Sequence, residues 1–276
     1  MNRTWMQDAP RLLLLSLAAL VVLAPYVFML SASVKPGPEI FQSSLTLWPQ
    51  RFYGWENYGK ALTSVPLLRF LWNGATVCAV ILFFQLLFAV PCAYALAKLR
   101  WPGREWVFAL VMLGLLIPAH VPALPLYVAF AKLGLLDTYT ALSAPFAISV
   151  FAVFMFRQAF KAMPDELIQA ARLDGMGELG IVWRVILPNA WPTATAFATF
   201  SVVAHWTDLF WPLITVQTQS MATPALGVLF FRAEEGGNDT GVLMAACVVT
   251  TLPMVAAFLL AQRRFIQGVA TAGLKG

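Results

Sequence analysis

Three ionisable side chains stand inside long apolar stretches of the sequence: His120, His205 and Asp208. Asp208 ends a run without Asp, Glu, Lys or Arg, and His205 precedes it by three residues, which places both on one face of a helix. Ionisable groups in such surroundings typically line a polar pathway. The pair therefore predicts a polar path, although a solvated helix end at Asp208 fits the same pattern.

Three prolines flank the other histidine: Pro118, Pro122 and Pro125. Proline frees backbone carbonyl groups, which inside a membrane need buried partners or a wet cavity. His120 therefore either lines such a cavity or marks a kinked helix. Asn73 and Gln85 also lie in an apolar run, where hydrogen bonds between helices are the expected role of an amide.

Residue types suited to catalysis are scarce. The sequence contains two histidines in all, no glycine-lysine phosphate loop and no metalloprotease histidine pair. We therefore expect no enzymatic activity, no bound cofactor and no metal site in this chain. The three cysteines, Cys78, Cys92 and Cys247, fall in apolar stretches and are predicted to be packing residues.

The composition indicates an integral membrane protein. Hydrophobic residues make up 60% of the 276 residues, charged residues make up 11%, and the mean hydropathy is +0.75. A bilayer core of about 30 Å needs about 20 apolar residues per helix. Six stretches meet this need, near 12–31, 70–97, 106–131, 138–156, 191–216 and 241–261. We predict an all-α membrane domain over 1–276 with six transmembrane helices, the second and third tilted or broken.

Basic residues predict the orientation. If both termini lie in the cytoplasm, most of the 18 Lys and Arg residues fall on the cytoplasmic side, as is usual for membrane proteins. We therefore predict a multi-pass protein of a bacterial inner membrane with both termini in the cytoplasm. The net charge of +5 follows from this asymmetry and does not indicate nucleic-acid binding. The first apolar run follows Arg3 and Arg11 as in a signal peptide, but it is longer than a signal core, and its removal would leave an odd number of spans.

A polar, charge-bearing loop, 161–190, separates the fourth and fifth apolar runs. Its first helix is predicted to begin at Pro164, Asp165 and Glu166, to be apolar on one side through Leu167, Ile168, Ala171 and Leu173, and to end at Gly175. Its second helix is predicted from the helical spacing of Ile181, Val182, Val185 and Ile186, with Asp174 as its cap and Pro188 as its end. Two short amphipathic helices joined by a glycine turn lie across a membrane surface or dock on a partner.

The order Gln169-Ala170-Ala171, then Gly175, then Val185-Ile186-Leu187-Pro188 resembles the pattern E-A-A, three residues, G, nine residues, I-x-L-P. That pattern marks permease subunits of binding-protein-dependent ABC importers, with Gln169 here in place of the usual glutamate and Val185 in place of isoleucine. Other segments resemble the maltose and glycerol-phosphate branch: Tyr94–Lys98, Trp101–Arg104, Gly134–Thr138 and the tail from Thr271. Trp206-Thr207-Asp208 stands where that family typically has W-N-E or W-N-D.

The resemblance implies a maltose-permease-like fold and a subunit that imports a carbohydrate or polyol by alternating access. It implies a second homologous permease, an ATPase dimer that binds ATP and Mg²⁺, and an external solute-binding protein. The second permease would supply most cargo contacts.

The resemblance also assigns roles to residues. Those expected to couple to the ATPase are Glu166, Gln169, Ala170, Ala171, Asp174, Gly175 and Pro188, with Lys275 as a C-terminal contact. His120, His205, Trp206 and Asp208 are pathway candidates, with Trp206 stacking on a sugar or anchoring at the interface. The alternatives are a stand-alone secondary transporter, an importer of a non-carbohydrate solute and a membrane-embedded enzyme.

Overall fold

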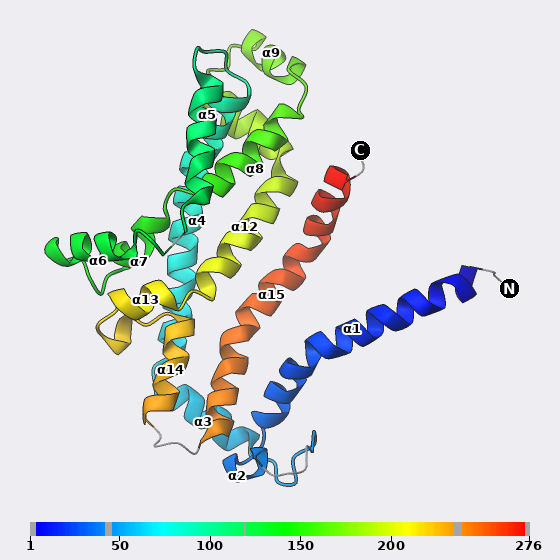
Figure 1. Cartoon of the computed structure of the whole chain (residues 1–276), viewed down its shortest axis with the longest axis vertical. Coiled ribbons are helices and arrows are strands. Elements are labelled where there is room, and N and C mark those ends of the chain that lie inside the picture. The colour runs from blue at the N-terminus through cyan, green and yellow to red at the C-terminus, as the bar shows by residue number, and fades with distance from the viewer. Residues whose placement is uncertain (1–3, 42–45, 119, 235–238, 274–276) are drawn as a thin grey trace. The chain divides into compact units, whose positions relative to one another are not determined.

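The computed structural model describes residues 4–41, 46–118, 120–234 and 239–273, and within these ranges it contains helices and no strand. The longer helices are α1 (Thr4–Ala32), α3 (Gly54–Thr63), α4 (Leu67–Ala97), α5 (Arg104–Leu113), α6 (Ala123–Lys132), α8 (Val150–Lys161), α9 (Glu166–Leu173), α12 (Trp191–Trp206), α14 (Pro224–Glu234) and α15 (Thr240–Gly273). The shorter elements are α2 (Gly37–Ile40), α7 (Tyr139–Ser143), α10 (Glu178–Ile181), α11 (Leu187–Asn189) and α13 (Phe210–Thr215), with single 3-10 or π turns between them (Figure 1). The predicted all-α class is confirmed.

Three helical stretches in the described part of the chain are long and apolar enough to cross a membrane: Pro10–Ala32, Leu67–Ala97 and Thr240–Leu259. They correspond to the first, second and last predicted spans. A fourth crossing results if Tyr139–Phe146 and Val150–Lys161, bent by 45° at a short break, form one span. α4 has 31 residues and is about 46 Å long, more than a straight crossing of the bilayer core needs.

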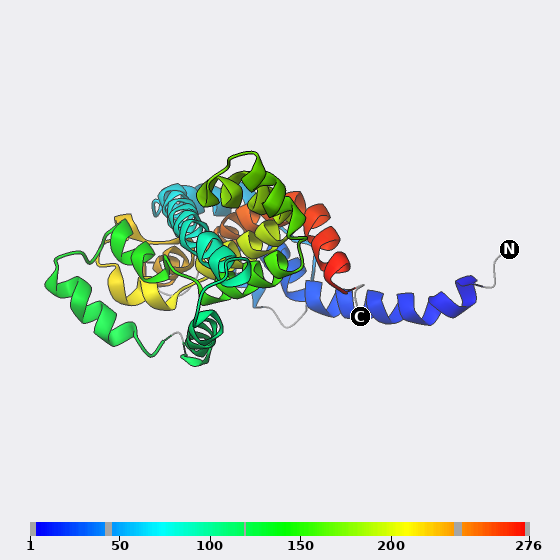
Figure 2. The same cartoon turned by 90° about the horizontal axis from the view of Figure 1, so that it is seen from above.

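The predicted spans 106–131 and 191–216 are not continuous helices. α5 ends at Leu113, and Pro118 and Pro122 lie in the non-helical segment before α6, which runs in a different direction from α5 (Figures 1 and 2). α12 ends at Trp206, and α13 begins only at Phe210. Proline lacks the amide hydrogen that a helix needs, so the first break follows from the sequence. The break in 106–131 agrees with the prediction that this span is tilted or broken, whereas the prediction that 191–216 continues as one helix through Asp208 was wrong.

One compact unit combines 1–68 with 227–252. Its centre is Asn57 in α3, whose buried Nδ2 donates hydrogen bonds to the carbonyls of Ser33 (2.9 Å) and Lys35 (2.8 Å). The backbone of α15 comes close at Gly241, where a Cβ atom would stand 2.6 Å from Asn57 Nδ2. Within this unit, only glycine at that position lets α15 approach the asparagine.

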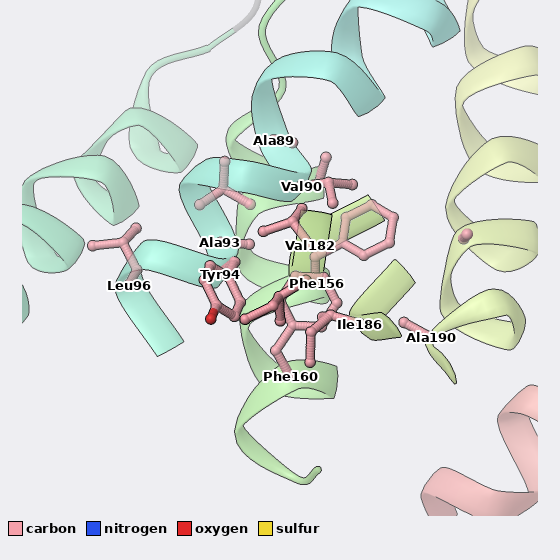
Figure 3. Packing of buried hydrophobic residues seen from close by; sticks show 14 of the residues in the cluster. Ala89, Val90, Ala93, Tyr94, Leu96, Phe156, Phe160, Val182, Ile186 and Ala190 are labelled. Atoms are coloured by element: carbon pink, nitrogen blue, oxygen red, sulfur yellow. The ribbon is translucent and has the colours of Figure 1, made fainter. Parts of the chain in front are cut away.

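The other unit comprises 69–226 and 253–276, and its core joins α4, α8, α12 and the 161–190 loop. Ala89 and Ala93 let α4 pack closely, as small residues do between membrane helices, and Phe156 and Phe160 of α8 fill the adjoining space. Figure 3 shows these side chains converging with Val182 of the loop. The loop is therefore part of the core of this unit.

Candidate functional sites

The 161–190 loop has the predicted helix–glycine–helix form. α9 ends in a Schellman motif, in which the Gly175 amide donates to the Arg172 carbonyl and the Met176 amide to the Ala171 carbonyl, both at 3.0 Å. Gly175 has φ +80°, a backbone conformation that favours glycine. The prediction that Gly175 supplies the turn is confirmed.

Only half of the predicted apolar face of α9 is buried. Ile168 and Ala171 are 3% and 4% exposed and pack in the core. Leu167 is 39% exposed and Leu173 is 89% exposed. Leu173 lies five residues after Ile168, about 140° around the helix, so it cannot face the same neighbour. The prediction of one continuous apolar face was wrong at these two leucines.

The second helix of the loop passes through Pro188 instead of ending there. α10 continues into a π turn, Val182–Ile186, and then into α11, in which the proline occupies the first turn. In the π turn the Leu187 amide donates to the Val182 carbonyl, five residues back. At this wider turn one series of helical hydrogen bonds ends and another begins. Proline is tolerated in the first turn of the new series, because the amide groups there have no partner within the helix. Ile181, Val182 and Ile186 of the predicted apolar set are buried, and Val185 is half-buried.

The predicted capping role of Asp174 was also wrong. Asp174 is the C-cap of α9, and its backbone amide donates to the Ala170 carbonyl. Gly177 occupies the N-cap of α10, three residues later, and no side chain caps that helix. The turn continues for two residues beyond Gly175, so the second helix begins too far from Asp174 for that side chain to cap it.

Two polar links join this loop to α4. Tyr94 Oη donates a 2.6 Å hydrogen bond to Glu178 Oε2, and Arg172 Nε donates to Glu178 Oε1 at 2.8 Å. Lys98 Nζ donates to the Met163 carbonyl at 2.6 Å and pairs with the Asp165 carboxylate. The start of α9 and the start of α10 are thus both fastened to the C-terminal part of α4.

These links lower the pKa values of both carboxyl groups. The hydrogen bond from Arg172, followed by that from Tyr94, holds the pKa of Glu178 below its ordinary value. The hydrogen bond from Lys98 lowers the pKa of Asp165 in the same way. Sequence reasoning paired neither acid with its partner, because a tyrosine or lysine at a helix end carries no signal of which distant acid it will meet.

A buried arginine ties three helices together near the same loop. Arg157 of α8 is 3% exposed, and its Nη2 lies 3.1 and 2.8 Å from the two carboxylate oxygens of Glu105. Its Nε donates to the Leu96 carbonyl at 3.1 Å, and its guanidinium carbon lies 3.6 Å from the centroid of the Phe108 ring. Its fork-shaped guanidinium thus fixes α4, α5 and α8, a role that sequence reasoning missed.

The remaining loop candidates lie on the surface. Glu166, Gln169, Ala170 and Pro188 are exposed, whereas Ala171 faces the core. Lys275 lies outside the described residues. Whether any of these side chains contacts an ATPase remains a prediction.

A cavity of about 610 Å³ brings together three pathway candidates that are distant in sequence: His120, His205 and Asp208 all line it. The prediction that Asp208 and His205 share one helix face was wrong, because α12 ends between them. Its Oδ1 accepts hydrogen bonds from the amides of Phe210 (3.0 Å) and Trp211 (3.4 Å) and thereby caps α13.

Aromatic rings hold both histidines at the cavity wall. The His120 ring centroid lies 4.5 Å from that of Phe210, and the His205 centroid lies 4.8 Å from that of Phe146. His205 Nε2 also lies 3.4 Å from Gln85 Nε2. Within the described residues, no three His, Cys, Asp or Glu side chains cluster as a metal site would require.

The amides Asn73 and Gln85 join helices, as predicted. Asn73 Nδ2 donates to the Ser220 and Ala222 carbonyls at 2.9 Å, and its Oδ1 accepts from the Tyr139 hydroxyl at 2.6 Å. Gln85 Nε2 donates to the Phe146 carbonyl at 3.0 Å. These bonds connect α4 with segments more than 60 residues away in the sequence.

Trp206 is the one pathway candidate that does not line the cavity. It is 8% exposed, and it lies outside the set of described residues that line the cavity. Its ring packs near Gly74 of α4, where a Cβ atom would stand 3.4 Å from the indole. Trp206 is therefore a packing residue between α12 and α4.

An all-helical membrane protein with a docked helix–glycine–helix loop is the class that this fold defines. Residues 85–271 match the family described as binding-protein-dependent transport system inner membrane component, and the chain belongs to that family. The resemblance first seen in the 161–190 loop is confirmed.

Curated relatives and solved structures agree with this family. The chain is 33% identical to the arabinooligosaccharides transport system permease protein AraQ of Halalkalibacterium halodurans, over 94% of this chain and 93% of the relative. It is 32% identical to the sn-glycerol-3-phosphate transport system permease protein UgpE of Yersinia enterocolitica, over 88% and 84%. The fold matches a chain in the crystal structure of a bacterial ABC transporter that imports the acidic polysaccharide alginate, with TM-score 0.82, 23% identity and coverage of 96% and 99%.

Proposed function

We propose that this chain is a permease subunit of an ABC importer that moves a carbohydrate or polyol across the bacterial inner membrane. Relatives named for arabinooligosaccharide and glycerol-phosphate transport support the cargo class. The chain works with a second permease, two ATPase subunits and an external binding protein. ATP and Mg²⁺ bind to the ATPase subunits, and this chain performs no hydrolysis.

Six membrane crossings and cytoplasmic termini complete the proposal. The broken runs 106–131 and 191–216 supply the third and fifth crossings. The other crossings come from the helices that are long and apolar enough to span a membrane, with the bent pair counted as one span. Broken helices are tolerated at membrane depth where they are buried in protein or line a cavity. The segments on either side of both breaks line the 610 Å³ cavity, which supports this assignment.

The observation that carries the coupling role is the exposure of Leu173 and Leu179 on the two sides of the Gly175 turn. They are 89% and 68% exposed, although the loop buries Ile168 and Ile181 a few residues away. Contiguous exposed apolar side chains mark sites of interaction with a protein or a membrane. Ala170 on the same helix is small enough for close approach. We assign this face, from Gln169 to Leu179, to the ATPase subunit, with Lys275 as a second contact.

Movement reaches the cavity through α4. ATP-driven closure of the ATPase pair displaces the loop, and the links at Tyr94–Glu178 and Lys98–Asp165 carry that displacement into the C-terminal part of α4. Further along α4, Gln85 lines the cavity and bonds to the segment before α8. Alternating access then follows from a change in how these helices pack around the cavity.

The test is a complex assembled from this chain with its neighbouring permease, ATPase and binding protein. We expect cargo-stimulated ATPase activity in the wild type, a loss of about tenfold in Leu173→Asp and near-normal stimulation in the matched control Leu173→Met. Full stimulation in Leu173→Asp would remove the docking role of this face. An assembled wild-type complex that no saccharide or polyol stimulates would remove the proposed function.

A further inference from the structure

The charge of the groups around the 610 Å³ cavity indicates what kind of cargo it takes. Among the described residues, its lining holds one carboxylate, Asp208, and neither lysine nor arginine. We propose that the cavity receives an uncharged saccharide or polyol and rejects phosphate esters and acidic oligosaccharides, with Asp208 as the discriminating residue. This inference rests on the proposed import function and narrows its cargo.

Some polar atoms of the cavity lining already make hydrogen bonds within the protein. Gln85 Nε2 donates to the Phe146 carbonyl, and Gln85 Oε1 accepts a 2.6 Å hydrogen bond from the Ser201 hydroxyl. Asp208 Oδ1 accepts the amide hydrogen of Phe210. Both ends of the glutamine and one oxygen of the carboxylate are therefore fixed by the fold, which makes the wall rigid before any ligand arrives.

Other polar atoms at the cavity have no hydrogen bond within the described residues. They are Asp208 Oδ2, both ring nitrogens of His120 and Nδ1 of His205. A neutral imidazole donates through one nitrogen and accepts through the other, and a carboxylate oxygen accepts. Hydroxyl groups both donate and accept, so a polyol satisfies all of these atoms. The hydroxyl-to-carboxylate bond is of the stronger, charge-assisted kind.

Aromatic rings supply part of the apolar lining. Phe146, Phe151, Phe210 and Trp211 border the same space. Their faces suit the CH groups of a sugar ring, and a mostly apolar wall with a few fixed polar groups is the usual form of a small-molecule site.

An anionic cargo meets the opposite situation. A phosphate or carboxylate entering the cavity loses water and finds a carboxylate in place of a cation. Desolvation of an unpaired ion is unfavourable in a protein interior, and repulsion by Asp208 adds to that penalty. We therefore expect this chain to differ in cargo from the relative named for sn-glycerol-3-phosphate and from the alginate importer that shares its fold.

The experiment separates this inference from the proposed function. Cargo-stimulated ATPase activity of the full complex with its binding protein tests the function. Equilibrium dialysis of the complex without binding protein tests the cavity, using arabinobiose, maltose and glycerol as neutral probes and sn-glycerol 3-phosphate and an alginate disaccharide as anions. We expect at least one neutral probe to bind at least about tenfold more tightly than either anion. Stimulation combined with equal or tighter binding of an anion overturns the inference alone, and absence of stimulation by any probe overturns both.

Asp208 offers a matched pair of variants. Asparagine caps helices as well as aspartate does, so Asp208→Asn keeps the start of α13 and removes the charge. Asp208→Glu keeps the charge. We expect the neutral-to-anion binding ratio to fall about tenfold in Asp208→Asn and to persist in Asp208→Glu. A wild-type ratio in Asp208→Asn would show that the discrimination does not come from this carboxylate.

Discussion

Tyr94 Oη donates a 2.6 Å hydrogen bond to Glu178 Oε2, which joins a buried tyrosine of α4 to the first residue of α10 across 84 positions of sequence. Arg172 holds the other oxygen of the same carboxylate. One acid therefore connects both helices of the 161–190 loop to a long membrane helix. A displacement applied to the loop by a partner has a direct polar route into α4.

Tyr94→Phe removes this hydrogen bond and keeps the ring in the core. A hydrogen bond to a charged group contributes about 1.5–3 kcal/mol, and less where the carboxylate is partly exposed as in Glu178, so we expect a modest fall in the Tm of the purified chain. We expect a larger effect on the coupling of ATP hydrolysis to transport, measured as cargo moved per ATP in proteoliposomes. Leu96→Ile, a change in the same core without a polar group, is the control. An unchanged transport ratio in Tyr94→Phe would contradict this role of the hydroxyl.

Attachment of the loop should depend on pH only in the acid range. The folded pKa of Glu178 lies below its ordinary value of 4.5, and that of Asp165 lies below 3.8. A carboxyl group with a lowered folded pKa stabilises the native state fully above its unfolded pKa, and this stabilisation is lost as pH falls through the folded pKa.

Hydrogen exchange of 165–180 checks this expectation. We expect constant protection between pH 6 and 8 after correction for the intrinsic rate, and loss of protection below about pH 4. Glu178→Gln should be less protected at neutral pH and less sensitive to acid. Loss of protection between pH 6 and 8 in the wild type would point to a group other than these two acids.

Gly175 is required for its backbone conformation and not for lack of space. A Cβ atom at this position meets nothing within 4 Å, but φ is +80°. We expect Gly175→Val to lower the stability by about 1–2 kcal/mol and Gly175→Asn to have a much smaller effect, because asparagine tolerates the left-handed region. Thermal unfolding of both variants gives the comparison. Equal destabilisation by Asn and Val would mean that the side chain itself is excluded.

The ion pair of Arg157 and Glu105 is unequal, because the arginine side chain is 3% exposed and the glutamate side chain is 62% exposed. Glu105→Gln leaves a buried cation without its carboxylate. Arg157→Met leaves an exposed carboxylate that still pairs with Arg104 at 3.0 Å. We therefore expect Glu105→Gln to lower the Tm more than Arg157→Met does, and the double variant to recover part of the loss. The opposite order of Tm values would show that the packing of Arg157 on Phe108 outweighs its charge.

Local rules account for the features that the sequence predicted correctly. The lengths of the apolar runs located the crossings in α1, α4 and α15, and Gly175 located the end of α9. Asn73 and Gln85 were identified as links between helices because an amide at membrane depth needs partners. The order of small residues, glycine and proline in the 161–190 loop was enough to indicate the family, which the match over 85–271 confirms.

Burial and pairing over long distances were beyond local rules. Nothing near Leu173 shows that it is 89% exposed while Ile168 is buried, since the neighbours of α9 come from α4 and α8. Trp206 is buried because α4 has a glycine beside it at position 74. The break after Trp206 places Asp208 at the start of α13, where its carboxylate caps the helix and faces the same cavity as His120.

The sequence by itself therefore determined the helical membrane class, three of the crossings and the form of the loop, because hydrophobic length and glycine conformation act over a few residues. The tertiary structure alone decided that Tyr94 meets Glu178, that Arg157 meets Glu105 and that two histidines and an aspartate share one cavity. Each of these depends on packing between helices that are far apart in the chain, and many side chains of the same type would satisfy the local pattern equally well.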